Sequence, residues 1–396
     1  MESAYLNGEI NAIKSKSFAH RISICNFLAG NKISSVKGVK SKDIIATENC
    51  LNALIQKQSE LLCGESGSTL RFMLPLCASL GGEYTFLGQG KLLSRPNEEL
   101  FSVLSANGVD CKKFDDKITI KGKLSAGEYK IRGDISSQYI SGLLMALPTL
   151  DGDSKIILTT PLVSKPYVDI TLEVLRNYGV KIIENNNCFI IKGNQKYLGN
   201  IEPEGDWSNT AFFFVGGAIN GNIIIKGLNA NSVQGDKSIV EVITSAGGKI
   251  CCDNGIFSVQ KSELKAFTFD AEDCPDLVPI LAVLASFASG KSIIKNIQRL
   301  KIKESDRIES TMALLNAFGI KAECDGVDLT VYGGELAVNT PVINSYNDHR
   351  IVMASAILAT FSKCGCIIEG AEAVNKSYPN FFEHLTKLGG KCSELQ

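Results

Sequence analysis

Two hydrophobic patterns alternate along the 396-residue chain. Short runs rich in β-branched residues, such as Ser154–Leu158, Asn222–Lys226 and Ser292–Asn296, predict strands. Longer segments with apolar residues at helical spacing, such as Arg307–Leu315, predict helices. A chain that alternates the two element types belongs to the α/β class.

The pattern repeats. Each of five predicted helices ends in a similar way at a glycine, namely Gly108, Gly179, Gly247, Gly319 and Gly389, spaced by 71, 68, 72 and 70 residues. A glycine directly after a helix suits the left-handed conformation that often ends one. A strand precedes each helix, and two short β-rich segments follow most of the glycines. Units of about 70 residues are too large for a solenoid, so we expect subdomains packed into two larger bodies.

Proline and glycine interrupt the pattern at 201–205, which marks a break in mid-chain. An extended segment before Lys16 could form a strand of the second body. We therefore predict a first domain at 15–203 and a second at 1–14 and 204–396. The chain would cross between them at hinges near 13–16 and 201–206.

Composition narrows the classes of function. A net charge of −1 excludes a general nucleic-acid surface, so any cationic patch must be local. The 13 cysteines form no CxxC pair and the three histidines lie far apart, which predicts reduced, buried thiols and no metal site. No apolar run reaches transmembrane length and no signal region opens the chain, so we expect a cytoplasmic protein with no membrane partner.

Three predicted helix starts are rich in small polar residues: Gly64–Arg71, Gly133–Gln138 and Ser164–Tyr167. A helix N-terminus offers free N–H groups and a partial positive charge, so each could receive a phosphate or carboxylate. The alternative is that the serines only cap their own helices. For any one of these helix starts alone, capping is the better interpretation.

Cations accompany these turns, and one turn also carries acids. Lys303, Glu304, Asp306 and Arg307 crowd the start of one helix, where a solvated helix end is the plain interpretation. Further basic residues near predicted turns are Lys16, Arg21, Arg95, Arg350 and Lys376. Each alone is an ordinary surface residue. Together they could bind a substrate with more than one acidic group.

In order and spacing, these segments resemble the family of 5-enolpyruvylshikimate-3-phosphate synthases over nearly the whole chain. The matching segments are Ser15–Ser17 with Arg21, Gly64–Arg71, Arg95-Pro96, Ser136–Gln138, Ser164–Tyr167, Lys303–Arg307, Asn347–Arg350 and Lys376–Pro379. Ile13-Lys14 stands where family members usually have Pro-Gly, which leaves the shape of the first crossover open.

The resemblance implies two domains, each of three βαβαββ units, in the inside-out α/β barrel fold of enolpyruvyl transferases. It implies transfer of the enolpyruvyl group of phosphoenolpyruvate to the 5-hydroxyl of shikimate 3-phosphate, a step toward chorismate and the aromatic amino acids. It also implies a monomer that uses no metal or organic cofactor and closes its domains around these two small molecules.

The resemblance assigns residues as well. Shikimate 3-phosphate would contact Lys16, Ser17, Arg21, Ser136, Ser137, Gln138, Ser164, Tyr167, Asp276 and Lys303. Phosphoenolpyruvate would contact Lys16, Gly67, Arg95, Gln138, Arg307, Arg350 and Lys376. Lys16, Asp276 and Glu304 would be catalytic, with Asp276 as the base toward the hydroxyl and Glu304 as the proton donor to the methylene carbon. In the family, the glycine at position 67 lines the site of the inhibitor glyphosate.

Two other functions stay open at this point. A related enzyme transfers enolpyruvate to a UDP-amino sugar, but it should lack the Ser136–Gln138 and Ser164–Tyr167 pair. A non-catalytic repeat scaffold that binds an anionic partner would leave the acids Asp276 and Glu304 unexplained.

Overall fold

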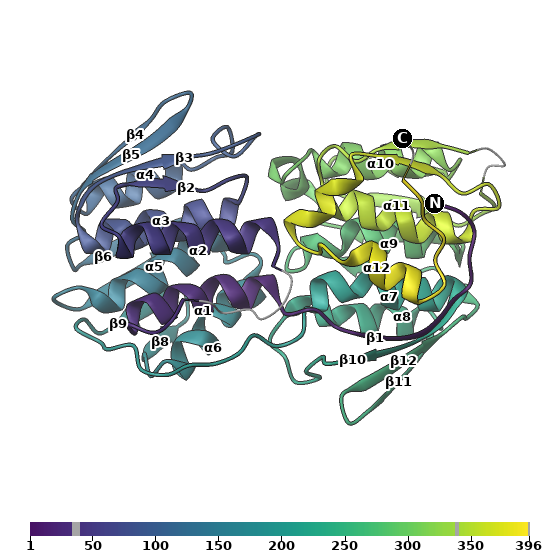
Figure 1. Cartoon of the computed structure of the whole chain (residues 1–396), viewed down its shortest axis with the longest axis horizontal. Coiled ribbons are helices and arrows are strands. Elements are labelled where there is room, and N and C mark those ends of the chain that lie inside the picture. The colour runs from purple at the N-terminus through teal and green to yellow at the C-terminus, as the bar shows by residue number, and fades with distance from the viewer. Residues whose placement is uncertain (34–39, 337–339, 395–396) are drawn as a thin grey trace. The chain divides into compact units, whose positions relative to one another are not determined.

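The computed structural model describes residues 1–33, 40–336 and 340–394. Its internal contacts divide the chain into two compact units (Figure 1). Unit 1 comprises Met1–Ser15 and Glu204–Gln396, and unit 2 comprises Lys16–Pro203. Unit 2 is therefore one continuous piece of chain, whereas unit 1 is built from two.

Unit 2 alternates helices and strands. In chain order its elements are α1 (Lys16–Leu28), α2 (Lys42–Ile55), β2 (Glu60–Leu62), α3 (Gly67–Leu80), β3 (Gly82–Leu87), α4 (Glu98–Ala106), β4 (Val109–Lys113), β5 (Lys117–Gly122), β6 (Glu128–Ile131), α5 (Ser137–Ala146), β7 (Ser154–Leu158), α6 (Lys165–Asn177), β8 (Ile182–Asn185) and β9 (Cys188–Ile191).

Unit 1 repeats the same alternation. Its elements are β1 (Leu6–Asn11), α7 (Trp207–Asn220), β10 (Gly221–Lys226), α8 (Ile239–Ser245), β11 (Lys249–Asp253), β12 (Ile256–Gln260), β13 (Leu264–Lys265), β14 (Thr268–Asp270), α9 (Val278–Ser286), β15 (Ala288–Ser289), β16 (Lys291–Lys295), α10 (Arg307–Ala317), β17 (Ala322–Cys324), β18 (Leu329–Tyr332), β19 (Val342–Asn344), α11 (His349–Phe361), β20 (Ile367–Glu369) and α12 (Phe381–Lys387).

Four sheets share one strand order. They run β2-β3-β5-β4 and β6-β7-β9-β8 in unit 2, and β1-β10-β12-β11 and β14-β16-β18-β17 in unit 1. In each sheet the first pair is parallel and the other pairs are antiparallel. A parallel pair needs a crossover and an antiparallel pair only a hairpin, so three of the sheets each follow from one continuous βαβαββ segment, whereas the fourth takes its first strand, β1, from the N-terminal segment. The repeat expected from the glycine spacing is present in the fold.

The five glycines that mark the repeat end α4, α6, α8, α10 and α12. Their φ angles are 98°, 77°, 90°, 73° and 97° for Gly108, Gly179, Gly247, Gly319 and Gly389. Behind four of them the chain closes back on the helix, through bonds from the N–H groups of Val180, Gly248, Ile320 and Gly390 to the carbonyls of Leu175, Ile243, Leu315 and Leu385 (2.9, 2.8, 3.0 and 2.8 Å). This is the hydrogen-bonding pattern of a glycine-terminated helix, as the sequence predicted.

Helices form the interior of each unit. In unit 1, all nine residues of α9 and 12 of the 13 residues of α11 are buried, and in unit 2 so are 12 of the 14 residues of α3. The strands instead alternate, as in β10, where Gly221, Ile223 and Ile225 are buried and Asn222 and Ile224 are exposed. Each sheet therefore turns one face to helices and one to solvent, which confirms the expected α/β fold with helices inside.

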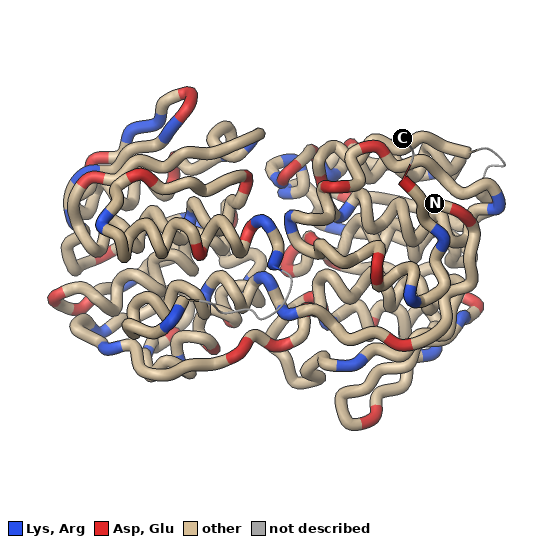
Figure 2. The backbone as a smooth tube through the Cα atoms, viewed as in Figure 1, with Lys and Arg blue, Asp and Glu red and all other residues tan. Residues whose placement is uncertain are grey.

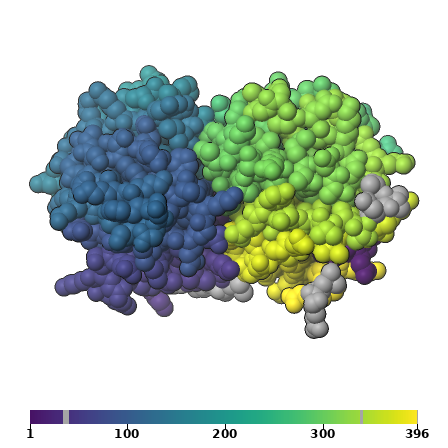
Figure 3. Space-filling view, turned by 90° about the horizontal axis from the view of Figure 1, so that it is seen from above, coloured from purple at the N-terminus to yellow at the C-terminus, as the bar shows by residue number. Residues whose placement is uncertain are grey.

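The N-terminal segment belongs to unit 1. Strand β1 pairs in parallel with β10, in register from Leu6 with Gly221 to Asn11 with Lys226. Glu2 forms a bridge with Lys391, and the purple start of the chain lies beside the yellow C-terminal part (Figure 3). Further on, the Ile13 carbonyl accepts from the Asp206 N–H at 2.8 Å. Residues 13–15, where the chain leaves unit 1, thus run antiparallel to residues 204–206, where it returns.

The expectation that the cysteines are buried is only partly right. Six of the 13 are buried, but Cys251, Cys252 and Cys392 are exposed, and Cys111, Cys188, Cys324 and Cys364 are partly exposed; all are free. Cys251 and Cys252 lie on β11, an edge strand of its sheet, so that the strand leaves them accessible to solvent. Within the described ranges, no helix is both long and apolar enough to cross a membrane.

Candidate active site

Asp276 is the centre of a charged cluster in unit 1. It lies on a short 3₁₀ turn, Pro275–Leu277, directly before α9. Its Oδ1 contacts Arg307 Nη1 at 2.9 Å and Lys303 Nζ at 3.3 Å, and its Oδ2 contacts Arg350 Nη2 at 2.9 Å. Three cations from two segments that are distant in the sequence therefore converge on one carboxylate.

Arg307 also contacts Glu304, the second predicted catalytic acid, and so connects it to Asp276. Its Nη2 contacts Glu304 Oε2 at 2.6 Å, and its Nε contacts Asp348 Oδ2 at 2.8 Å. The side chain of Arg307 is only 1% exposed, so these charge-assisted bonds fix its position. Asp306 has a different task, because its side chain accepts from the N–H groups of Ile308 and Glu309 and so caps α10. The capping interpretation holds for Asp306, while Glu304 joins the cluster.

The cations of the cluster keep Asp276 charged. Burial by itself would favour neutral Asp276, but Arg350, Lys303 and Arg307 hold the pKa of its carboxyl well below the usual value. Burial lowers the pKa of Lys303, and Asp276 opposes that shift. Asp276 is therefore ionised, with its oxygens occupied by cations.

Arg350 and Lys376 come from the C-terminal part of unit 1. Arg350 lies in the first turn of α11, and Asp348 caps this helix by accepting from the Arg350 N–H at 2.9 Å. Arg350 Nη2 also donates to Ser208 Oγ at 2.8 Å. Lys376 Nζ donates to the carbonyl of Asn347 at 2.7 Å, one residue before the cap.

Arg21 forms the corresponding buried centre in unit 2. Its guanidinium donates to Thr171 Oγ1 (2.6 Å), the Ser17 carbonyl (2.7 Å), the Tyr167 carbonyl (2.8 Å) and Ser141 Oγ (3.2 Å). Burial lowers the pKa of Arg21 to about 9. Within the described residues it hydrogen-bonds only to neutral oxygens, so no carboxylate contacts this buried cation. A buried cation without an acid beside it favours binding of an anion.

The serines at the three helix starts do not behave alike. Ser66 accepts from the Thr69 N–H, and Ser136 accepts from the Gln138 N–H, so both cap their helices. Ser164 makes no such cap and lies in the left-handed region, at φ 54° and ψ 40°. It is 2% exposed. A buried non-glycine residue in this conformation is costly and typical of functional sites.

Gly67 and Arg95 are adjacent. A Cβ placed on Gly67 would lie 2.7 Å from Arg95 Nη1, closer than a real Cβ contact. Gly67 is the first residue of α3 and does not have a positive φ. The Arg95 guanidinium therefore fills the space beside Gly67 and would have to shift to admit a larger residue.

Gln138 and Lys16 contact residues that sequence reasoning did not assign. Arg71 Nη1 donates to Gln138 Oε1 at 2.7 Å, and Lys16 Nζ pairs with Asp43 Oδ2 at 2.9 Å. Arg71 stands inside a matching segment, as does Asp348, so position beside the motif residues could have suggested both. Asp43 carried no such signal.

Within each unit, direct contacts join some of the predicted residues. In unit 1, direct contacts join Asp276, Lys303, Glu304, Arg307 and Arg350. In unit 2, Arg21 contacts the backbone of Ser17 and Tyr167, Gly67 adjoins Arg95, and Gln138 N–H contacts Ser136. The charged residues of each unit are marked in Figure 2.

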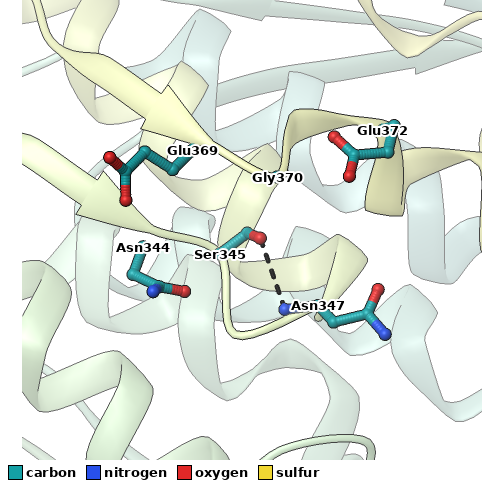
Figure 4. A pocket seen from close by; sticks show the side chains of 6 residues that line it. All are labelled: Asn344, Ser345, Asn347, Glu369, Gly370 and Glu372. Atoms are coloured by element: carbon teal, nitrogen blue, oxygen red, sulfur yellow. Dashed lines mark hydrogen bonds between the residues drawn. The ribbon is translucent and has the colours of Figure 1, made fainter. Parts of the chain in front are cut away.

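A surface pocket of about 280 Å³ in unit 1 does not coincide with these groups. Asn344, Ser345, Asn347, Glu369, Gly370 and Glu372 line it, and the two glutamates flank it (Figure 4). Two carboxylates would repel an acidic substrate, so this pocket is a poor anion site. Across the described ranges, no three His, Cys, Asp or Glu side chains are placed to bind a metal ion.

Comparison with known proteins identifies the family. The model of the EPSP synthase (3-phosphoshikimate 1-carboxyvinyltransferase) family matches residues 42–385. The 3-phosphoshikimate 1-carboxyvinyltransferase of Clostridium botulinum Eklund 17B is 39% identical, over 98% of this chain and 96% of the relative. That of Clostridium kluyveri is 41% identical, also over 98% and 96%.

Solved structures agree on the fold. EPSP synthase from Acinetobacter baumannii superposes with a TM-score of 0.78 at 21% identity, over 100% of this chain and 98% of that one. The enolpyruvyl transferase NikO from Streptomyces tendae gives 0.76 at 15% identity, over 98% and 96%. From the family match and the full-length relatives it follows that the chain belongs to the EPSP synthase family.

Proposed function

We propose that this chain is a 3-phosphoshikimate 1-carboxyvinyltransferase (EC 2.5.1.19) that works as a monomer. It transfers the enolpyruvyl group of phosphoenolpyruvate to the 5-hydroxyl of shikimate 3-phosphate and releases phosphate, in the route to chorismate. The single observation that carries the proposal is the cluster in which Lys303, Arg307 and Arg350 contact Asp276, and Arg307 also contacts Glu304. It contains the acid–base pair and the anion-binding groups that this reaction needs.

Shikimate 3-phosphate is assigned mainly to unit 2. Arg21 is a buried guanidinium with neutral partners, which suits a phosphate. Ser17, Ser136, Ser137, Ser164, Gln138 and Tyr167 complete the assignment in unit 2, and Asp276 and Lys303 add to it from unit 1. The left-handed turn at Ser164 supports its role, because the residue is not used as a helix cap.

Phosphoenolpyruvate is assigned to residues of both units, most of them cations. Arg95, Lys16, Gly67 and Gln138 belong to unit 2, and Arg307, Arg350 and Lys376 belong to unit 1. Gly67 lets the Arg95 guanidinium lie against the start of α3, so that the guanidinium and the N–H groups of the helix start could receive one acidic ligand together. Both substrates carry a carboxylate and a phosphate, so fixed cations offset their mutual repulsion.

The two acids divide the proton transfers. The 5-hydroxyl oxygen bonds to C2 of phosphoenolpyruvate while Asp276 accepts the hydroxyl proton and Glu304 protonates the methylene carbon. Elimination then breaks the C–O bond to phosphate, and Glu304 recovers a proton from the methyl group. Because Arg307 and Arg350 occupy the oxygens of Asp276, an acidic substrate that binds these arginines would release Asp276 and raise its basicity.

Phosphate release tests the proposal. We expect release only when both phosphoenolpyruvate and shikimate 3-phosphate are present. Single-turnover assays that replace shikimate 3-phosphate with a UDP-amino sugar should give none. Two results would contradict the proposal. One is phosphate release with the UDP-amino sugar, and the other is no phosphate release when phosphoenolpyruvate and shikimate 3-phosphate are both present.

A further inference from the structure

Arg71 connects three segments of unit 2. It lies on α3 and is 5% exposed. Its Nε donates to Asn97 Oδ1 (3.1 Å), its Nη2 to the Pro96 carbonyl (3.0 Å), and its Nη1 to Gln138 Oε1 (2.7 Å). The guanidinium also lies over the ring of Tyr139, 5.5 Å from its centroid. Its position is therefore fixed by contacts on several sides.

The bond to Gln138 has only one possible direction. A guanidinium has five N–H donors and no acceptor, so the atom of Gln138 that faces it must be the carbonyl oxygen. The amide NH₂ must then point the other way. It does so in the structure, where Gln138 Nε2 donates to Ser68 Oγ at 2.9 Å. That bond uses one of the two amide protons.

We propose that Arg71 is a positioning residue that orients the Gln138 amide, so that Gln138 offers substrate an N–H donor and not a carbonyl oxygen. The inference rests on the proposed role of Gln138 in phosphoenolpyruvate binding. It adds a reason for that role, since a donor attracts an acidic ligand and a carbonyl oxygen repels it. Arg71 itself contacts no substrate in this proposal.

Two substitutions at Gln138 test the orientation without changing Arg71. Gln138→Ala removes the amide, and we expect the KM for phosphoenolpyruvate to rise roughly 10- to 100-fold at saturating shikimate 3-phosphate. Gln138→Glu keeps an oxygen for Arg71 but loses the donor, so it should be at least as impaired. Near-normal KM in Gln138→Glu would overturn the inference, because the oxygen would then be the working atom.

A double-mutant cycle tests the link to Arg71. Arg71→Met keeps the length of the side chain but cannot donate, so Gln138 loses its orientation. We expect about a tenfold rise in KM in the wild-type background and less than about a threefold rise in the Gln138→Ala background. Equal rises in both backgrounds would show that Arg71 acts by another route and would overturn the inference.

Conservative and control variants separate positioning from folding. Arg71→Lys keeps a charged donor near Gln138 Oε1 and should recover most of the KM lost in Arg71→Met. Asn97→Ala removes another acceptor of Arg71 and leaves the bond to Gln138, so its KM should rise less than about threefold. If Arg71→Met does not fold, Arg71→Leu, which likewise cannot donate, completes the cycle instead. An unchanged KM in Gln138→Ala would refute the role of Gln138 and this inference, yet leave phosphate release and the proposed reaction intact.

Discussion

At the residue scale, Arg307 is the side chain through which the two proposed catalytic acids are connected. It bonds to Asp276, Glu304 and Asp348 and is almost fully buried. A buried cation with three carboxylates stays charged, and the pKa of Arg307 is raised by Asp348, Glu304 and Asp276 against the effect of burial. Substitution of either Asp276 or Glu304 therefore also changes the surroundings of Arg307.

Glu304→Gln should separate proton transfer from structure. Glutamine keeps an oxygen for Arg307 but cannot supply the proton, so turnover should fall roughly 10²- to 10⁴-fold. Binding of shikimate 3-phosphate, measured by calorimetry, should change little, because Glu304 is not assigned to it. Turnover near the wild-type rate would rule out the assigned role.

Asp276→Asn should lower turnover while strengthening binding of phosphoenolpyruvate. Asparagine removes the base and also the charge that occupies Arg307 and Arg350, which leaves both arginines more available to an acidic ligand. We expect a turnover loss of about 10²- to 10⁴-fold, with a dissociation constant equal to or below that of wild type. The matched control is Asp253→Asn, an exposed acid on β11, which should leave both values unchanged. Weaker binding in Asp276→Asn would argue against competition for the arginines.

Gly67→Ala should weaken glyphosate far more than phosphoenolpyruvate. The added methyl would meet the Arg95 guanidinium and take space that the longer inhibitor needs more. The inhibition constant for glyphosate and the KM for phosphoenolpyruvate should be measured side by side, together with the melting temperature. Equal rises in the two constants would mean that Gly67 does not line the inhibitor site.

Sequence reasoning at this scale found charged residues but not most of their partners. Lys303, Glu304 and Arg307 are close in the sequence, so their cluster could be predicted. Asp43 lies 27 residues from Lys16, and Arg71 lies 67 residues from Gln138. Only the fold brings such pairs together, and no periodicity indicates which polar residue a distant cation will contact.

At the element scale, the start of α6 differs from the starts of α3 and α5. The sequence predicted all three helices but could not show that Ser164 would be left-handed while Ser66 and Ser136 cap. Backbone angles at a single residue depend on how the flanking elements pack. The helix ends were easier to predict, because a glycine after a helix has a direct conformational reason.

A pair of substitutions at Ser164 separates conformation from binding. Ser164→Gly removes the hydroxyl and suits φ 54°, whereas Ser164→Ala removes the hydroxyl and keeps the Cβ. We expect the glycine variant to be more stable than the alanine variant by about 1 kcal/mol in denaturant unfolding. Both should bind shikimate 3-phosphate more weakly than wild type by calorimetry. Wild-type binding in both variants would remove Ser164 from the site.

At the scale of the whole molecule, unit 2 is a continuous chain with its own buried residues. We expect residues 16–203, expressed alone, to unfold cooperatively and to bind shikimate 3-phosphate weakly, because Arg21 and the assigned serines all lie within it. The fragment should release no phosphate from phosphoenolpyruvate, since Asp276 and Glu304 are missing.

Two arginine variants of the fragment provide the comparison. Arg21→Met should abolish binding, measured by NMR titration, whereas Arg132→Met at an exposed position should not. Binding that survives Arg21→Met would contradict the assigned phosphate site.

Strand β1 has a consequence for synthesis of the protein. Leu6–Asn11 leaves the ribosome well before its partner β10, which begins at Gly221. Unit 2 can fold in the interval, while β1 has no strand to pair with until more than 200 further residues have been made. Because pairing across such a long loop is slow, completion of unit 1 should limit the folding rate. During elongation, Leu6 and Ile10, the apolar side chains that β1 buries in the finished sheet, lack their partner strand, and such apolar surface is what chaperones bind.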